Sequence, residues 1–191
     1  MKCRWLVLTG LLLASGAPAH RLDEYLQAAR VDLAADRIDV DLDLTPGVAV
    51  ADRVFRMLDA NGDGRISREE ARAYARRVLA EIPIELDQQA HKLEVWDIHL
   101  PATNEWGGGL GIIRLAAGKR NLHLAPGTHV LTLTNHHLAP FSAYQVNALT
   151  PRNPALRIIT QSRDENQQGY RLEFEIGAPK PEAKDKAPTG K

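Results

Sequence analysis

The chain has 191 residues, with 24 Lys and Arg against 24 Asp and Glu, and a single Cys. This length is typical of one domain and suffices for a hydrophobic core. The 44% of hydrophobic residues argues against an intrinsically disordered chain. Because the acidic and basic residues balance, we exclude a nucleic-acid-binding protein that neutralises many phosphates through a broad basic face.

The first 19 residues have the pattern of a cleaved signal peptide. Lys2 and Arg4 precede an apolar run over residues 5–14, and Ala17-Pro18-Ala19 matches a small-residue cleavage site. A membrane-spanning helix needs roughly 20 apolar residues, so we favour cleavage over a retained anchor. The mature chain then begins at His20, has no cysteine, and has a formal charge of −2, since the signal carries two basic and no acidic residues. We therefore expect an exported protein, periplasmic or secreted, without disulfides.

Alternation with a period of two residues predicts that most of the chain is β-strand. Apolar residues alternate with aspartates over residues 38–44, and residues 170–176 give the clearest strand. Further strands are predicted at residues 25–33, 84–87, 92–100, 110–117, 129–134, 143–149 and 156–161, with 84–87 and 92–100 paired as a hairpin across 88–90. Many short strands indicate an antiparallel sandwich or an open barrel.

The period changes to that of a helix on both sides of residues 59–70. Apolar residues recur at positions 51, 54, 55 and 58, and again at 71, 74, 75 and 78. We predict a single, mainly β domain over residues 20–177, with a helix–loop–helix insert at 48–80 between its second and third strands. Residues 178–191, rich in Pro, Ala and Lys, are expected to form a flexible tail. We expect no transmembrane segment in the mature chain.

Four arginines lie largely off the apolar face of the second predicted helix. They are Arg68, Arg72, Arg76 and Arg77. Such a basic stripe is usually a solvated helix face, and we favour that interpretation over a docking surface for an anionic lipid or a partner.

The strongest motif is DANGDGRISREE, residues 59–70, which resembles the twelve-residue EF-hand calcium loop throughout its length. A hard dication takes six to eight oxygen ligands. The ligands expected here come from Asp59, Asn61, Asp63, the backbone carbonyl of Arg65, Ser67 directly or through water, and both carboxylate oxygens of Glu70. Gly64 supplies the sharp turn at the sixth position. The complete ligand set predicts bound Ca²⁺ rather than a vestigial loop, and the terminal Glu favours Ca²⁺ over Mg²⁺.

The surroundings of the loop bear on the role of its calcium. EF-hand loops usually pair through a short strand around the eighth position, here Ile66, and the chain has no second loop. Ile66 must therefore pack on the sandwich, on a second copy in a homodimer, or on another partner. Calcium outside the cytoplasm is plentiful, so a Kd on the order of 10⁻⁴–10⁻³ M suffices, and we expect a structural calcium more than a sensor.

The histidines suggest a second metal site. After cleavage, the free amine and ring nitrogen of His20 can chelate a copper ion, and a second histidine can complete the site. Candidates are His99, His136 and His137, of which the last two form the only adjacent pair. Imidazole suits copper, nickel and zinc, although no ligand spacing here is diagnostic. The alternative function is therefore a periplasmic carrier of copper, nickel or cobalt.

We predict no enzymatic activity. The mature chain lacks a thiol, and no serine lies in a nucleophile-elbow sequence. Residues 105–109, EWGGG, lack the following Lys-Ser/Thr of a phosphate-binding loop. Asp39, Asp41 and Asp43 share one strand face, which a solvated surface explains more simply than a catalytic carboxylate cluster.

The order of these features resembles a bacterial extracytoplasmic domain. His20-Arg21-Leu22 follows the signal directly, an acidic hairpin comes next, and one EF-hand loop leads into Ala73-Tyr74-Ala75 and a run of strands. Similar domains precede polytopic nickel/cobalt permeases, including hydrogenase- and urease-accessory permeases, although relatives tend to have His-Pro-Leu after the signal. The resemblance implies an accessory module whose partner is a membrane permease or another periplasmic protein. It implies no substrate, and we expect no transport activity from this chain.

Overall fold

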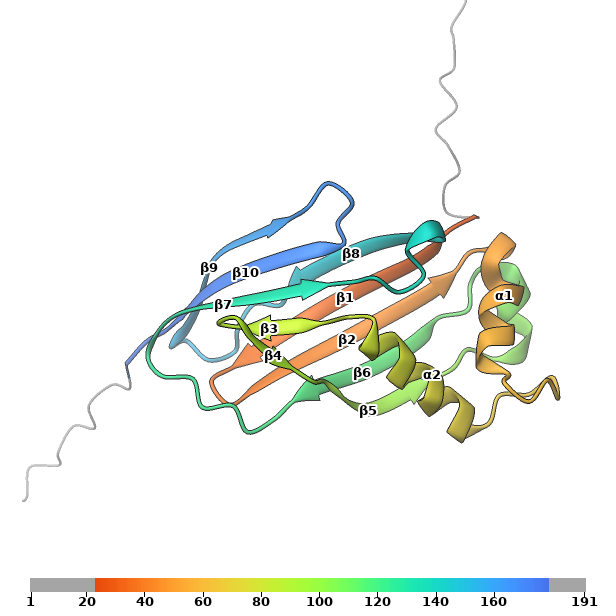
Figure 1. The fold of residues 1–191 in the computed structure, drawn as a ribbon, viewed down its shortest axis with the longest axis horizontal. Helices are drawn as coiled ribbons and strands as arrows, with labels where there is room; N and C mark the ends of the chain where they lie inside the picture. Colours follow the sequence, from red (N-terminus) through yellow and green to blue (C-terminus); the bar gives the residue numbers. More distant parts are fainter. Residues whose placement is uncertain (1–22, 179–191) are drawn as a thin grey trace, which may run out of the picture.

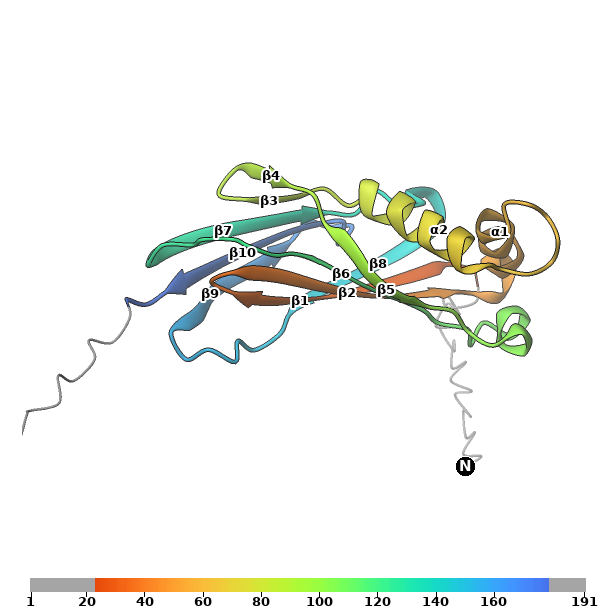
Figure 2. The same cartoon turned by 90° about the horizontal axis from the view of Figure 1, so that it is seen from below.

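Two five-stranded sheets pack against each other in residues 23–178, the part of the chain that this computed structural model describes (Figures 1 and 2). The first sheet has the order β5 (Glu94–His99), β6 (Ile113–Lys119), β2 (Arg37–Pro46), β1 (Tyr25–Ala34) and β8 (Ser142–Ala148). The second has the order β4 (Gln89–His91), β3 (Ile84–Leu86), β7 (Gly127–Thr134), β10 (Gly169–Ile176) and β9 (Leu156–Arg163). Neighbouring strands are antiparallel, except that β1 and β8 are parallel. The predicted mainly β fold is confirmed.

The core lies between the inner faces of the two sheets. In β2, Ile38, Val40, Leu42 and Leu44 are each at most 1% exposed, as the alternation of the sequence predicts. Phe174 of β10 in the opposite sheet is fully buried as well. Burial of each large apolar side chain contributes about 1.5–3 kcal/mol, so the contact between the sheets stabilises the whole domain.

The outer face of β2 carries the three aspartates, two of which are paired with arginines. Arg30 on β1 reaches Asp43 at 2.8 Å. Arg37 lies 3.0 Å from Asp39, while Asp41 is exposed. Two of the three carboxylates therefore belong to ion pairs on a partly solvated sheet surface, and the third contacts water.

Two α-helices lie at one end of the sandwich. α1 (Val48–Leu58) begins directly after β2, and α2 (Arg68–Ala80) leads into β3. Figure 2 shows α2 over the strands of the first sheet, in the same layer as β3 and β4, and α1 next to it at the end of these strands. Both helices are inserted between the second and third strands, as predicted. Their buried residues are Val50, Ala51, Val54 and Leu58 on α1 and Ala71, Tyr74, Ala75 and Val78 on α2. Two short 3₁₀ helices, η1 (Thr103–Gly108) and η2 (Ala139–Phe141), complete the described elements.

The hairpin predicted between residues 84–87 and 92–100 is wrong. β3 pairs with β4, and Asp87 and Gln88 form the turn with positive φ angles of 50° and 66°. Such angles at both central residues are those of a type I′ hairpin turn. The chain then crosses to the other sheet, where β5 pairs with β6. The predicted signal peptide and residues 179–191 of the predicted tail lie outside the described residues.

Gly118 on β6 leaves room for a large aromatic side chain of the neighbouring edge strand. The register of β5 against β6 shifts between Val95 and Asp97, so Trp96 bulges out of the ladder. A Cβ atom at Gly118 would collide with the Trp96 ring and with the carbonyl oxygen of Ile38. Close approach of both neighbours therefore requires glycine at this position.

We expect Gly118→Ala to destabilise the protein by about 1–3 kcal/mol, because backbone and ring must move to admit the added methyl group. Gly108→Ala is the matched control, since the nearest atom to its Cβ is Leu110 Cγ at 4.0 Å. The control should change the free energy of unfolding by no more than about 0.5 kcal/mol. Urea denaturation measures both values, and equal effects would contradict this packing.

Candidate metal site

Residues 59–70 form a loop held at both ends by regular helices. Asp59 is the C-cap of α1, and its backbone N–H donates to Phe55 O. Ser67 is the N-cap of α2, where its Oγ accepts from the backbone N–H of Glu70. The Glu70 carboxylate accepts in return from the Ser67 backbone N–H at 2.9 Å, which completes a capping box. The last residue of the loop therefore both caps α2 and faces the candidate site.

Two glycines let the loop turn back on itself. Gly62 and Gly64 have φ angles of +72° and +79°, in the left-handed region that other residues rarely adopt. A Cβ at either position would meet nothing within 4 Å. The backbone conformation, not a lack of space, therefore requires glycine, as predicted for Gly64.

Side-chain oxygens from both ends of the loop bind its backbone amides. Asp59 accepts from the N–H groups of Asp63 at 3.1 Å and Gly64 at 2.9 Å. Asn61 Oδ1 also accepts from the Asp63 N–H, at 2.9 Å. Glu70 Oε1 reaches back to the Asn61 N–H at 3.1 Å and so closes the loop. These bonds hold the side-chain oxygens of the first, third and last loop positions close to the backbone of residues 61–64.

The terminal carboxylate is favoured in its ionised form. Hydrogen bonds from the backbone and hydroxyl of Ser67, and from the backbone of Asn61, lower the pKa of Glu70 below its usual value. A charged carboxylate is the form that coordinates a divalent ion, so Glu70 is ready for this role at neutral pH.

The donor set fits a hard divalent cation because it consists of oxygens. Within residues 23–178, no three His, Cys, Asp or Glu side chains lie close enough to hold a metal by themselves. The predicted ligand set accordingly also includes the Asn61 amide, the Ser67 hydroxyl and the Arg65 carbonyl oxygen. This combination of carboxylate, amide, hydroxyl and carbonyl oxygens is typical of a calcium loop.

Comparison with known proteins agrees with this geometry. A family model described as EF hand matches residues 50–72, from α1 through the whole loop into the first turn of α2. This segment is therefore similar to an EF-hand, and an EF-hand implies a divalent metal, typically Ca²⁺. Comparisons with curated proteins and with solved structures gave no match.

Ile66, at the eighth position of the loop, packs on the protein's own core. Its partly buried side chain contacts the main hydrophobic cluster. Ile66 thus packs within the chain, on a cluster that both helices and both sheets contribute to. No helix among residues 23–178 is long and apolar enough to cross a membrane.

The histidines predicted as a second metal site lie in different environments. His20 is outside the described residues. His99 is exposed and lies 2.9 Å from Asp97. His136 is exposed, whereas its neighbour His137 is fully buried. The structure therefore does not present the adjacent pair as two free imidazoles.

Both ring nitrogens of His137 are engaged in a buried chain of hydrogen bonds. Nδ1 lies 2.7 Å from Glu81 Oε2 at the end of α2, and Nε2 lies 3.0 Å from the Tyr74 hydroxyl. The Tyr74 hydroxyl in turn lies 2.9 Å from that of Tyr25 on β1. A metal at His137 would have to displace one of these partners.

The protonation states determine which group donates in each of these hydrogen bonds. Burial lowers the pKa of His137, so the ring is neutral and has one N–H. That N–H faces the Glu81 carboxylate, which can only accept, so Nε2 accepts from the Tyr74 hydroxyl. The Tyr74 oxygen is then free to accept from Tyr25. Burial also raises the pKa of Tyr74 to about 12, which keeps its proton in place.

The main chain at His137 is held as firmly as its ring. Its carbonyl oxygen accepts from Gln27 Nε2 and from the Tyr144 hydroxyl, each at 2.8 Å. Its N–H donates to Asn135 Oδ1 at 2.9 Å, and Asn135 also donates to Gln27. His137 thus joins α2, β1, β8 and the loop after β7 in one polar network.

The sequence interpretation missed this network. Tyr74 lies on the apolar face of α2, and a buried tyrosine hydroxyl requires a hydrogen-bond partner. That requirement predicts a polar group opposite α2, but it does not identify His137, which is 63 residues away.

We expect Tyr74→Phe to destabilise the protein by about 1–3 kcal/mol, because it leaves buried polar groups of Tyr25 and His137 without a partner. Tyr170→Phe is the control, since its hydroxyl bonds to the exposed side chain of Gln161, which can turn to water. The control should cost less than about 1 kcal/mol. Chemical denaturation compares the two, and an equal or larger loss for Tyr170→Phe would contradict the role of the network.

Proposed function

We propose that this protein is an exported calcium-binding module in which Ca²⁺ in the single EF-hand has a mainly structural role. The observation that carries the proposal is the continuity between loop and core. Glu70, the last loop ligand, lies one turn before Tyr74 on α2. An ion bound by Glu70 would therefore fix the end of the helix that carries Tyr74 into the buried network.

The apolar contacts of the loop support the same role. Leu58 precedes the loop and is 1% exposed, and Ile66 within it packs on the core. Ordering of the loop by calcium would thus also order residues that fill one end of the sandwich. Because such an ion is bound by the native state only, its binding free energy adds to the stability of the fold.

The cellular role we propose is that of a periplasmic accessory module. Its partner would be a membrane metal permease or another periplasmic protein. Support comes from the signal-like N-terminus and from the resemblance of the order of features to domains that precede nickel/cobalt permeases.

Calcium at about 100 times its Kd should stabilise the parent protein by about 2.7 kcal/mol, which corresponds to a rise in Tm of roughly 5–10 °C. Glu70→Gln should remove most of this rise, because it replaces the charged bidentate ligand. The neighbouring substitution Glu69→Gln, on the same first turn of α2, should retain it. Thermal unfolding in calcium and in chelator gives all six values. A calcium effect that is absent from the parent, or unchanged in Glu70→Gln, would overturn the structural role.

Export predicts a specific mature protein. Expressed from its full reading frame in a Gram-negative host, the chain should appear in the periplasmic fraction and begin at His20. Intact-mass analysis and N-terminal sequencing measure both properties. The variant Ala17→Lys/Ala19→Lys, which removes the small residues of the cleavage site, should retain the uncleaved N-terminus. Cytoplasmic protein that still begins at residue 1 in the parent would contradict export.

A further inference from the structure

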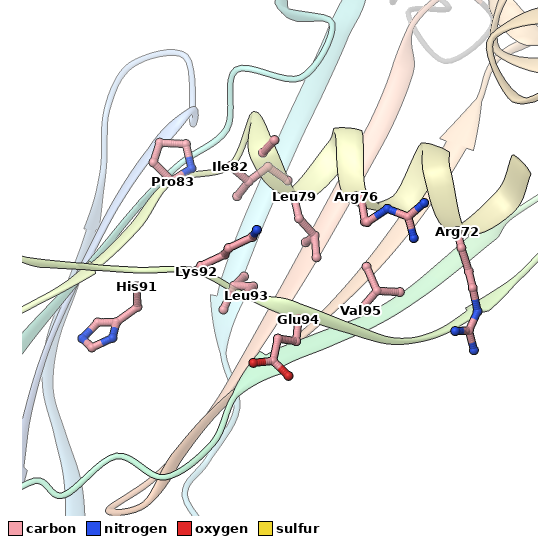
Figure 3. Close-up of a pocket in the computed structure, with 11 residues that line it drawn as sticks. Arg72, Arg76, Leu79, Ile82, Pro83, His91, Lys92, Leu93, Glu94 and Val95 are labelled. Atoms are coloured by element: carbon pink, nitrogen blue, oxygen red, sulfur yellow. The ribbon is translucent and has the colours of Figure 1, made fainter. Parts of the chain in front are cut away.

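A groove of about 560 Å³ lies between α2 and the segment that joins the two sheets, residues 91–95 (Figure 3). Its volume is within the range of small-molecule sites, which is roughly 300–1,000 Å³. The segment runs from β4 in the second sheet to β5 in the first, so the groove lies where the chain passes from one layer to the other. None of the predicted calcium ligands lines it.

The floor and walls of the groove are apolar. Ile82 and Leu93 are 1% and 6% exposed and belong to the core. Leu79 on α2 and Val95 on β5 are only partly buried and line the groove from opposite sides. In Figure 3 these side chains lie between the helix and the strand segment. A hydrocarbon group in the groove would cover apolar surface that otherwise contacts water.

The rim of the groove is basic. Arg72 and Arg76 are one turn apart on α2, and Lys92 lies on the facing segment. Within residues 23–178, none of these three has an ion pair, and Glu94 is the only carboxylate that lines the groove. The carboxylate of Glu94 points away from Arg72 and Arg76 in Figure 3. Two guanidinium groups are thus available to a negatively charged head group.

The basic stripe of α2 is therefore not uniform. Arg68 and Arg77 do not line this groove, whereas Arg72 and Arg76 stand beside its apolar floor. Arginines on a helix face that only contacts water would not need an apolar groove beside them. We propose that this groove binds a small amphipathic anion, with an apolar chain on Leu79, Leu93 and Val95 and one carboxylate or phosphate head at Arg72 and Arg76.

This inference names a ligand class for the binding module proposed above, but it rests on residues separate from the calcium loop. Its test therefore uses calcium-free protein in chelator, well below its Tm, because calcium ions precipitate long-chain carboxylates and alkyl phosphates. The outcome is scored separately from the effect of calcium on Tm. If the groove binds no anion, the proposed structural role of calcium is unaffected, and the reverse also holds.

Isothermal titration with monomeric decanoate and with decyl phosphate tests both head groups. At least one of them should bind at a single site, and the tighter ligand identifies the head group. Butyrate, which lacks the long chain, and 1-decanol, which lacks the charge, should each bind at least about tenfold more weakly. In NMR spectra the methyl signals of Leu79, Leu93 and Val95 should shift with the tighter ligand.

Charge-reversal variants locate the head group. Arg76→Glu and Arg72→Glu should each weaken binding at least about tenfold, because a charge-assisted hydrogen bond becomes a repulsion. Arg56→Glu is the matched control, an exposed arginine on α1 that does not line the groove, and it should bind like the parent. Equal Tm values show that all variants fold. The proposal is overturned if neither anion saturates the protein below about 1 mM, if decanol binds as tightly as the anions, or if both groove variants bind like the parent.

Discussion

One turn of helix α2 connects the calcium loop to the interior of the sandwich. Glu70 and Tyr74 are four residues apart, about 6 Å along the helix axis, and they face different environments. Glu70 closes the loop through Asn61 and Ser67, while Tyr74 bonds to Tyr25 and His137 in the core. Because a helix is rigid over so short a length, whatever fixes Glu70 also fixes the position of Tyr74. The rest of the structure at this end depends on that connection.

The buried network makes the connection specific. Apolar packing alone tolerates small shifts of a helix, whereas a chain of hydrogen bonds from Tyr25 through Tyr74 and His137 to Glu81 requires one register of α2. A shift would leave buried hydroxyl and imidazole groups unpaired, at a cost of about 1–3 kcal/mol for each. The network thus explains how the EF-hand-like segment, which has no second loop to pair with among residues 23–178, can be attached to a β-sandwich.

Local patterns predicted the parts of this molecule that depend on local chemistry. The turn of the loop could be predicted because glycine at its sixth position marks a left-handed backbone conformation, and β2 because its alternation matches a half-buried sheet. The pairing of β3 with β4 was missed, since a strand pattern does not identify its partner and the turn needed positive φ at Asp87 and Gln88. The role of His137 depends on residues distant in sequence. The periodicity of the sequence predicts neither such a contact nor the groove beside Arg72 and Arg76.

Hydrogen exchange with calcium and with chelator tests the link between the loop and the core most directly, because it reports stability amide by amide. If α2 transmits the effect of the ion, calcium should slow exchange in the loop, in α2, and also at residues 25–27 of β1 and around His137. The same protection pattern should be lost in Glu70→Gln. Protection confined to residues 59–70, with no change in β1 or near His137, would contradict the account.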